Sequence, residues 1–394
     1  MLYPYLDWQH GALSAALSGL PGRCLLGLPG WRPPAAALEV ATRTLAAMAP
    51  RHAPLEAAVR RDAGPGLACT VLEEIPFYRV VRFSRRGGAR RRVVLLAPHS
   101  GYAAAVLSPV VAALLQVGEV TVAADWTDAR LVPAAAGRFG LREQVAAAAR
   151  LLLAPSGDDD GPGPVQAPHV VAVSQSVPVA LLAAAEAADR RRPAVRGLAL
   201  LGGQADPRIA PRPVQRALAL WPRALTEAQL TTEVPAGYPG VGRRVYPGLL
   251  QLLAFASASP ELYLGVQGGL LLDLLHGGDR GFDRQHTDLH NLVDVPAELF
   301  ADTVDYFLGR AGVPDLAALA RVPLLTVEAA DDELVGAGQT HAAAAAIGTP
   351  AGLHASLTVP RGHHHDLFTG PTFLADVAPA LRRHVLVAEG AAPQ

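Results

Sequence analysis

HVVAVSQSVPVALLAAAE, residues 169–186, is the stretch that decides the expected fold of this chain. It begins with an apolar run of strand length, as expected of a strand buried on both faces of a parallel sheet. A short turn at 174–175 follows, and the remainder, rich in Ala and Leu, is typical of a helix. Strand, tight turn and helix in direct succession predict one unit of an α/β sheet.

Five further apolar runs of strand length are distributed along the chain. They are VVLLAP (93–98), VTVAADW (120–126), LALLGG (198–203), PLLTVEAADD (323–332) and ASLTVPRGH (355–363). Between these runs lie helix-like segments at 103–115, 141–153, 178–190 and 337–347. The alternation predicts a mostly parallel, doubly wound sheet. In such sheets the functional groups gather beyond the carboxyl ends of the strands.

The alternation is interrupted between residues 204 and 320. That segment is too long for an ordinary connection and contains helix-like and Pro/Gly-rich sequence. We therefore expect a largely helical cap at 204–320, inserted between two parts of an α/β core at 69–203 and 321–394. Residues 1–68 are expected to form an N-terminal helical extension.

Composition and charge argue against nucleic-acid binding. The chain has 394 residues, a formal net charge of -1 and 51% hydrophobic residues. This balance does not favour nucleic-acid binding, which needs a basic field, and the basic tract at 85–92 is interpreted as a solvated turn. We expect no signal peptide, no membrane span and a cytoplasmic location with Cys24 and Cys69 as free thiols. The oligomeric state is left open.

Ser174 is the candidate nucleophile, because it stands on the turn between the strand and the helix. The small residues Ala172 and Ser176 flank it and allow a sharp bend, although glycines are commoner at these two positions. The Gln175 N–H, at the start of the helix, is a candidate donor to an oxyanion. Ser176 is a competing nucleophile that we expect to lie inside the first helical turn.

A serine nucleophile needs a base and an orienting acid, which follow it along the chain in this class of fold. Asp332 is the candidate acid, since it ends the strand run 323–332. Asp331 and Asp206 are alternatives. The loop APHSGY (97–102) follows an earlier strand, so a backbone N–H of His99 or Ser100 is the expected second oxyanion donor.

The base is expected from VPRGHHHDLFTG (359–370), where three consecutive histidines follow the last predicted strand. A metal site is the rival interpretation. Side chains of adjacent residues diverge, however, and neither a Cys cluster nor an HExxH motif accompanies them. We therefore expect a catalytic histidine, with no metal and no organic cofactor.

Taken together, these segments resemble the intracellular polyhydroxyalkanoate depolymerases, also called polyhydroxybutyrate depolymerases, of the α/β-hydrolase superfamily. The resemblance rests on MLYPYLDWQH (1–10), APHSGYAAAVL (97–107), ADWTDARLVPAAAGRFGL (124–141), HVVAVSQSVPV (169–179), LGGQADPR (201–208), VYPGLLQL (245–252), PAELFADTVDYF (296–307), LLTVEAADDELVGAGQT (324–340) and HHDLFTG (364–370). It implies an α/β-hydrolase fold and cleavage of the polyester of storage granules, or of hydroxyalkanoate oligomers.

The resemblance also implies roles for individual residues. The family nucleophile corresponds to Ser174, where many members have cysteine, and the family acid corresponds to Asp332. The family histidine corresponds to His364 in an ungapped match, or to His363 if the preceding glycine is matched instead. Two alternative functions are an acyltransferase of the polyester-synthase type and a non-catalytic granule-associated protein.

Overall fold

The protein is described by a computed structural model covering residues 32–47, 55–88, 91–99, 101–102, 104–154, 167–188, 194–277, 281–311 and 314–390. The segment MLYPYLDWQH, Cys24 and Ser100 lie outside the described residues. Of the predicted extension at 1–68, the described part contains helices α3 (Arg32–Ala47) and α4 (Leu55–Ala63).

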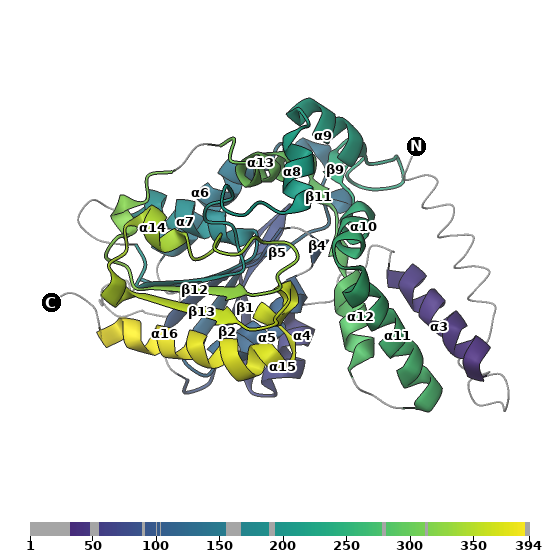
Figure 1. Ribbon diagram of the computed structural model, residues 1–394, viewed down its shortest axis with the longest axis horizontal. Helices are drawn as coiled ribbons and strands as arrows, with labels where there is room; N and C mark the ends of the chain where they lie inside the picture. Colours follow the sequence, from purple (N-terminus) through teal and green to yellow (C-terminus); the bar gives the residue numbers. More distant parts are fainter. Residues whose placement is uncertain are drawn as a thin grey trace.

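The core is an eight-stranded sheet with the order β1-β2-β5-β3-β6-β7-β12-β13 (Figure 1). In chain order its strands are β1 (Leu67–Ile75), β2 (Tyr78–Arg85), β3 (Arg92–Leu96), β5 (Glu119–Trp126), β6 (His169–Val173), β7 (Gly197–Leu201), β12 (Leu324–Ala329) and β13 (His354–Val359). The six strands from β5 to β13 in this order run parallel, whereas β1 and β2 are antiparallel. The predicted α/β fold with a mostly parallel sheet is confirmed.

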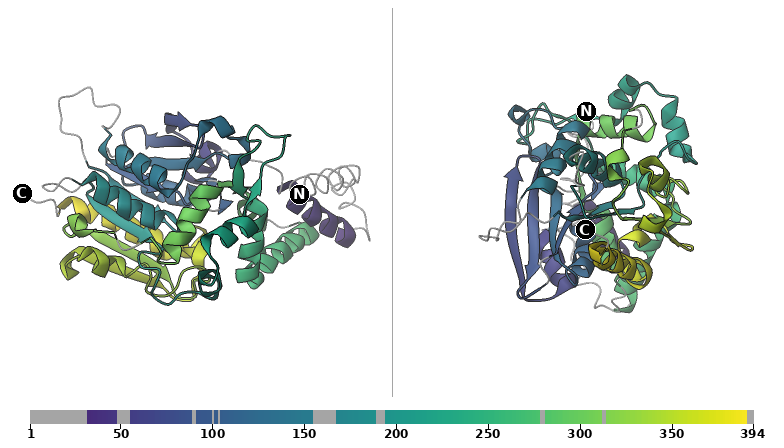
Figure 2. Two further views of the ribbon diagram at one scale, coloured as in Figure 1. Left: turned by 90° about the horizontal axis from the view of Figure 1, so that it is seen from above. Right: turned by 90° about the vertical axis from the view of Figure 1, so that its left-hand side faces the viewer.

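Helices cover both faces of the sheet (Figures 1 and 2). One face packs against α4, α5 (Ser108–Leu114) and α16 (Ala378–Gly390). The other packs against α6 (Leu141–Leu153), α7 (Ser176–Ala187) and α14 (Ala343–Ile347). Because both faces are covered, the central strands β3, β6 and β7 are buried along their whole length, which explains their unbroken apolar sequences.

Helix α14 is shorter than the helix expected at 337–347. The carboxylate of Glu328, at the end of β12, accepts hydrogen bonds from the N–H groups of Gly338, Thr340 and His341. These bonds hold 338–341 as a turn against the sheet, so the helix begins only at Ala343.

The segment between β7 and β12 is mixed rather than purely helical. Its helices are α8 (Pro213–Ala219), α9 (Arg223–Leu230), α10 (Gly248–Ala258), α11 (Pro260–His276), α12 (Phe282–His290) and α13 (Ala297–Phe307). It also contains a three-stranded sheet of β8 (Thr232–Glu233), β9 (Arg244–Tyr246) and β11 (Val295–Pro296). A further strand, β10 (Leu292–Val293), pairs with β4 (Gly101–Tyr102), which follows β3 in the core. We keep the term cap for residues 204–320; its exact limits remain a proposal.

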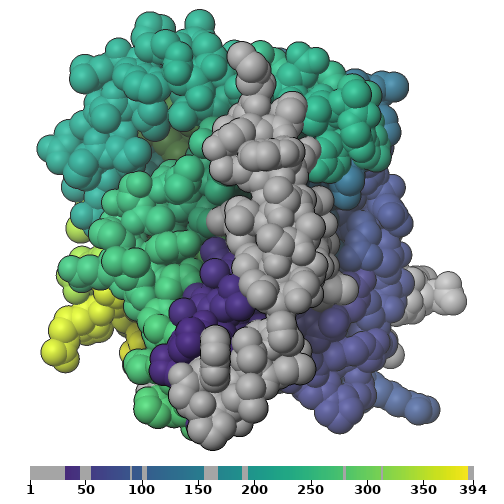
Figure 3. Space-filling model, turned by 90° about the vertical axis from the view of Figure 1, so that its right-hand side faces the viewer, coloured from purple at the N-terminus to yellow at the C-terminus, as the bar shows by residue number. Residues whose placement is uncertain are grey.

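Helix α3 packs against the cap helices α11 and α12, and Figure 3 shows α3 in purple beside the green cap. The contact includes an ion pair between Arg43 and Asp283 and a 2.9 Å hydrogen bond between Thr44 Oγ1 and His286 Nε2. Within the described residues, no single helix is long and apolar enough to cross a membrane, although α10 and α11 together, bent by 103°, pass the same test by length and composition.

Candidate active site

Ser174 stands in a strained turn between β6 and α7. Its φ angle is 55°, a left-handed value that non-glycine residues rarely adopt. The strain is held by hydrogen bonds on both sides: the Ser174 N–H donates to Leu201 O at 2.8 Å, and its carbonyl accepts from Val177 N at 3.0 Å. The turn is therefore a rigid support for the Ser174 hydroxyl.

Small residues surround the turn, and the structure shows why they are needed. A Cβ at Gly203, after the neighbouring strand β7, would lie 2.3 Å from both Ser174 O and Val177 Cγ2. Ser176 is fully buried, and its hydroxyl lies 2.7 Å from Leu96 O while accepting a 2.8 Å bond from Val173 N. Ser176 thus ties the turn to β3, and its hydroxyl does not face the pocket that Ser174 lines.

His364 joins Ser174 to Asp332. Its Nε2 lies 2.9 Å from Ser174 Oγ, and its Nδ1 lies 2.8 Å from Asp332 Oδ2. Asp332 follows β12 and His364 follows β13; because these strands are parallel neighbours, the loops at their carboxyl ends meet. The other Asp332 oxygen accepts the N–H groups of Leu334 and Val335, each at 2.8 Å, which fixes the carboxylate.

The alternative residues are located elsewhere. Asp331 is exposed, and Asp206 pairs with Arg208 at 2.7 Å. His363 is exposed and lies 3.5 Å from Glu333, while His365 packs against the rings of Phe255 and Phe368. Among the described residues, no group of three His, Cys, Asp or Glu side chains could hold one metal ion.

Burial and mutual pairing have opposite effects on the pKa values of His364 and Asp332, which with Ser174 form the proposed triad. Burial favours neutral His364, but the adjacent Asp332 carboxylate outweighs it and raises the pKa of His364. Burial likewise raises the pKa of Asp332, while His364 and the two backbone N–H groups lower it, with a net lowering. An ionised acid beside a histidine is the arrangement of a base that is oriented to accept a serine proton. Burial lowers the pKa of His365 to about 3, so that ring is neutral.

Of the three candidate oxyanion donors, Gln175 and His99 are among the described residues. Gln175 precedes α7 and lines the same pocket as Ser174, where the helix N-terminus contributes positive potential. The buried side chain of His99 hydrogen-bonds Thr303 of cap helix α13 at 2.8 Å, and burial lowers its pKa to about 3. Ser100 lies outside the described residues. All three assignments remain proposals.

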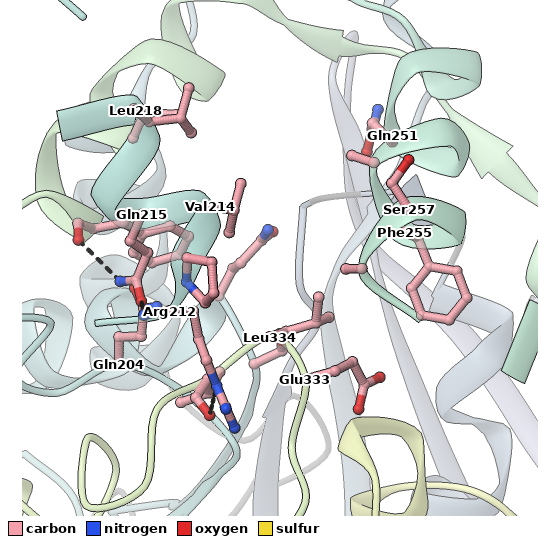
Figure 4. Close-up of a pocket in the computed structure, with 18 of the residues that line it drawn as sticks. Gln204, Arg212, Val214, Gln215, Leu218, Gln251, Phe255, Ser257, Glu333 and Leu334 are labelled. Atoms are coloured by element: carbon pink, nitrogen blue, oxygen red, sulfur yellow. Dashed lines mark hydrogen bonds between the residues drawn. The ribbon is translucent and has the colours of Figure 1, made fainter. Parts of the chain in front are cut away.

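Ser174 opens into a pocket of about 620 Å³, a size common among ligand-binding sites. In Figure 4, Val214, Gln215 and Leu218 of α8 face Gln251, Phe255 and Ser257 of α10 across the cavity. Gln204, the first residue of the cap, and Leu334, in the core loop after β12, also line it. The pocket therefore lies between the cap and the carboxyl ends of the core strands.

Two charged residues of this pocket were not identified as site residues from sequence. Arg212 precedes α8, and Glu333 follows Asp332 directly. Glu333 Oε2 accepts the backbone N–H of His364 at 3.2 Å. The acid after Asp332 was a usable signal for Glu333, whereas no sequence pattern singles out Arg212 from the other arginines of the cap.

Comparison with known proteins supports the resemblance. Residues 202–389 match the family model described as "PHB de-polymerase C-terminus", a range that includes Asp332 and His364 but not Ser174. No match was found among curated proteins.

Two solved structures share the fold. A presumed lipase from Acinetobacter baumannii AYE is 12% identical with a TM-score of 0.50, covering 86% of this chain and 98% of the other. A lipase in its open form is 16% identical with a TM-score of 0.50, covering 83% of this chain and all of the other (100%). The chain thus has an α/β-hydrolase fold, and its residues 202–389 are similar to the PHB depolymerase C-terminus family.

Proposed function

We propose that this protein is a serine esterase of the polyhydroxyalkanoate depolymerase type, which hydrolyses 3-hydroxyalkanoate polyester or its oligomers. The observation that carries the proposal is the hydrogen-bonded series in which His364 lies 2.9 Å from Ser174 Oγ and 2.8 Å from Asp332 Oδ2. The family match at 202–389 and the fold support a hydrolase of esters. The expected cytoplasmic, granule-associated location is part of the same proposal.

In the first half-reaction His364 Nε2 accepts the Ser174 proton while Ser174 Oγ attacks the ester carbonyl. Asp332 keeps the imidazole in the required orientation and stabilises its charged form. The negative charge that develops on the carbonyl oxygen is held by the N–H of Gln175 and by a donor from the loop at 99–100. Collapse of the intermediate breaks the ester C–O bond, and His364 passes its proton to the leaving alkoxide.

In the second half-reaction water attacks the acyl-serine, again with His364 as base. The acid fragment is released and the Ser174 hydroxyl is restored. Every proton transfer is carried by the described trio, so the mechanism requires no metal or organic cofactor.

The surroundings of the site suit an apolar substrate. Phe255, Leu218 and Leu334 line the pocket. Val214 at its edge is 50% exposed, and Leu253, on the pocket helix α10, is 53% exposed. A pocket lined largely by apolar side chains favours an uncharged, water-poor substrate segment such as a polyester chain.

The test compares Ser174→Ala with wild type and with Ser176→Ala as a matched control. Substrates are amorphous short- and medium-chain polyester granules and soluble p-nitrophenyl esters. We expect Ser174→Ala to lose at least about 10⁴-fold in kcat on both, while Ser176→Ala retains hydrolysis. Full activity of Ser174→Ala would contradict the proposed nucleophile. Hydrolysis of soluble esters alone would support an esterase but contradict the polyester substrate.

A further inference from the structure

The pocket beside Ser174 contains two opposite charges that are not paired with each other. Arg212 precedes α8 and Glu333 follows Asp332. In the described part of the chain, no ion pair joins their side chains, although both line one cavity. Figure 4 shows Arg212 on one side of Leu334 and Glu333 on the other. The pocket is therefore electrostatically polar, with a positive side at Arg212 and a negative side at Glu333.

Contacts with the described residues hold the guanidinium group of Arg212 through its Nε only. Its Nε donates to Val335 O at 3.2 Å, and its backbone N–H donates to Gln215 Oε1 at 2.7 Å. Within the described residues, the two terminal guanidinium nitrogens have no hydrogen-bond or ion-pair partner. Val335 N in turn donates to Asp332 Oδ1, so the loop that carries the acid also holds this guanidinium. A planar donor group is thus held in place beside the triad.

The interior of a polyester provides no partner for this group. Each repeat unit offers carbonyl and ester oxygens but no charge, and a polymer surface consists almost entirely of such units. A linear chain has one anionic group, the carboxylate at its end. The arginine fork fits a carboxylate through two parallel N–H···O bonds, which are stronger than bonds to neutral oxygens.

Resting on the proposed ester hydrolysis, we propose that Arg212 binds the free carboxylate of a linear hydroxyalkanoate chain, so that the preferred substrates are oligomers and carboxyl-terminal chain ends. Glu333, on the other side of Leu334, repels a carboxylate and favours entry in this one direction.

The chemistry is consistent with this orientation. When Ser174 Oγ bonds to an ester carbonyl carbon, the ester C–O bond breaks and the fragment that carries the free carboxylate leaves as an alkoxide. His364 returns the proton to that oxygen, giving a hydroxy acid. Arg212 therefore holds the leaving fragment while the acyl fragment stays on Ser174.

The experiment compares a linear 3-hydroxybutyrate trimer as the free acid with the same trimer as its methyl ester. Wild-type kcat/KM should be about tenfold or more higher for the acid, as expected when a charge-assisted pair is lost. Arg212→Gln should bring the ratio close to one, and Arg212→Lys, which keeps the charge but loses the fork, should give an intermediate ratio. Arg216→Gln is the control, because Arg216 lies exposed on α8, which Arg212 precedes, and is outside the pocket lining.

Each outcome has a distinct meaning. A wild-type ratio of one or less, or an unchanged ratio in both Arg212 variants, overturns the role of Arg212 and leaves ester hydrolysis standing. Failure of the wild-type protein to cleave the acid, the methyl ester and p-nitrophenyl esters overturns the proposed function, and this inference with it.

Discussion

Replacement of Asp332 by asparagine tests the orientation of the proposed base with little change in shape. Asp332 Oδ1 accepts two backbone N–H groups and Oδ2 faces His364 Nδ1. An asparagine amide would keep its oxygen on the two N–H groups, because turning its NH₂ toward them would leave both donors unpaired at about 1–3 kcal/mol each. The NH₂ would then donate to His364 Nδ1.

That new hydrogen bond changes the tautomer of the imidazole. With Nδ1 accepting, the ring proton resides on Nε2, which then donates to Ser174 Oγ and cannot take the serine proton. The carboxylate that raises the pKa of His364 and stabilises its charged form is also lost. We expect kcat to fall by about 10³- to 10⁴-fold, equivalent to about 4–5.5 kcal/mol in activation free energy.

The assay is steady-state hydrolysis of a soluble p-nitrophenyl ester, with KM expected to change little because Asp332 is buried behind His364. Asp331→Asn is the matched control: it makes the same substitution at the exposed neighbour and should stay within about twofold of wild type. Urea denaturation of both variants checks that the fold is intact. A folded Asp332→Asn protein within tenfold of wild-type kcat would refute the proposed role of this carboxylate.

Three further predictions follow from the same geometry. Glu333→Gln removes a charge that raises the pKa of the proposed catalytic imidazole, so the acid limb of the kcat/KM profile should move to lower pH; an unmoved limb would contradict this. Gly203→Ala should lower stability by about 1–3 kcal/mol in thermal unfolding and reduce activity, because its Cβ would meet Ser174 O, whereas Gly237→Ala, which has open space, should do neither. Ser176→Ala should destabilise the fold by about 1–3 kcal/mol in urea, since it leaves a buried backbone N–H unpaired; an unchanged midpoint would argue against a structural role.

Much of the fold was predictable because burial on both sheet faces leaves a clear signature. Five of the six parallel strands are almost fully buried and appear as separate apolar runs, whereas β13, at the sheet edge, is largely exposed. The connection at 204–320 is conspicuous by its length. The antiparallel strand β1 was not predicted: it lies at the edge of the sheet, is largely exposed, and its sequence LACTVLEEI ends in two glutamates before the final Ile. The three-stranded sheet in the cap was missed for a related reason: strands of two or three residues are too short to show a pattern.

By itself, the sequence determined the kinds of residue available for catalysis and their order along the chain. It placed Ser174 on a turn, Asp332 at a strand end and a histidine after the last strand, because local alternation of strand and helix dictates where strand ends occur. The residue pattern alone did not distinguish the three adjacent histidines, and the family resemblance favoured His364 with His363 as the alternative. Only the tertiary structure shows which ring lies between Ser174 and Asp332: the loop after β13 directs each ring differently and places His364 there. That Arg212 and Glu333 line the same pocket could not be predicted either, because it depends on how the cap lies over the core and not on any local pattern.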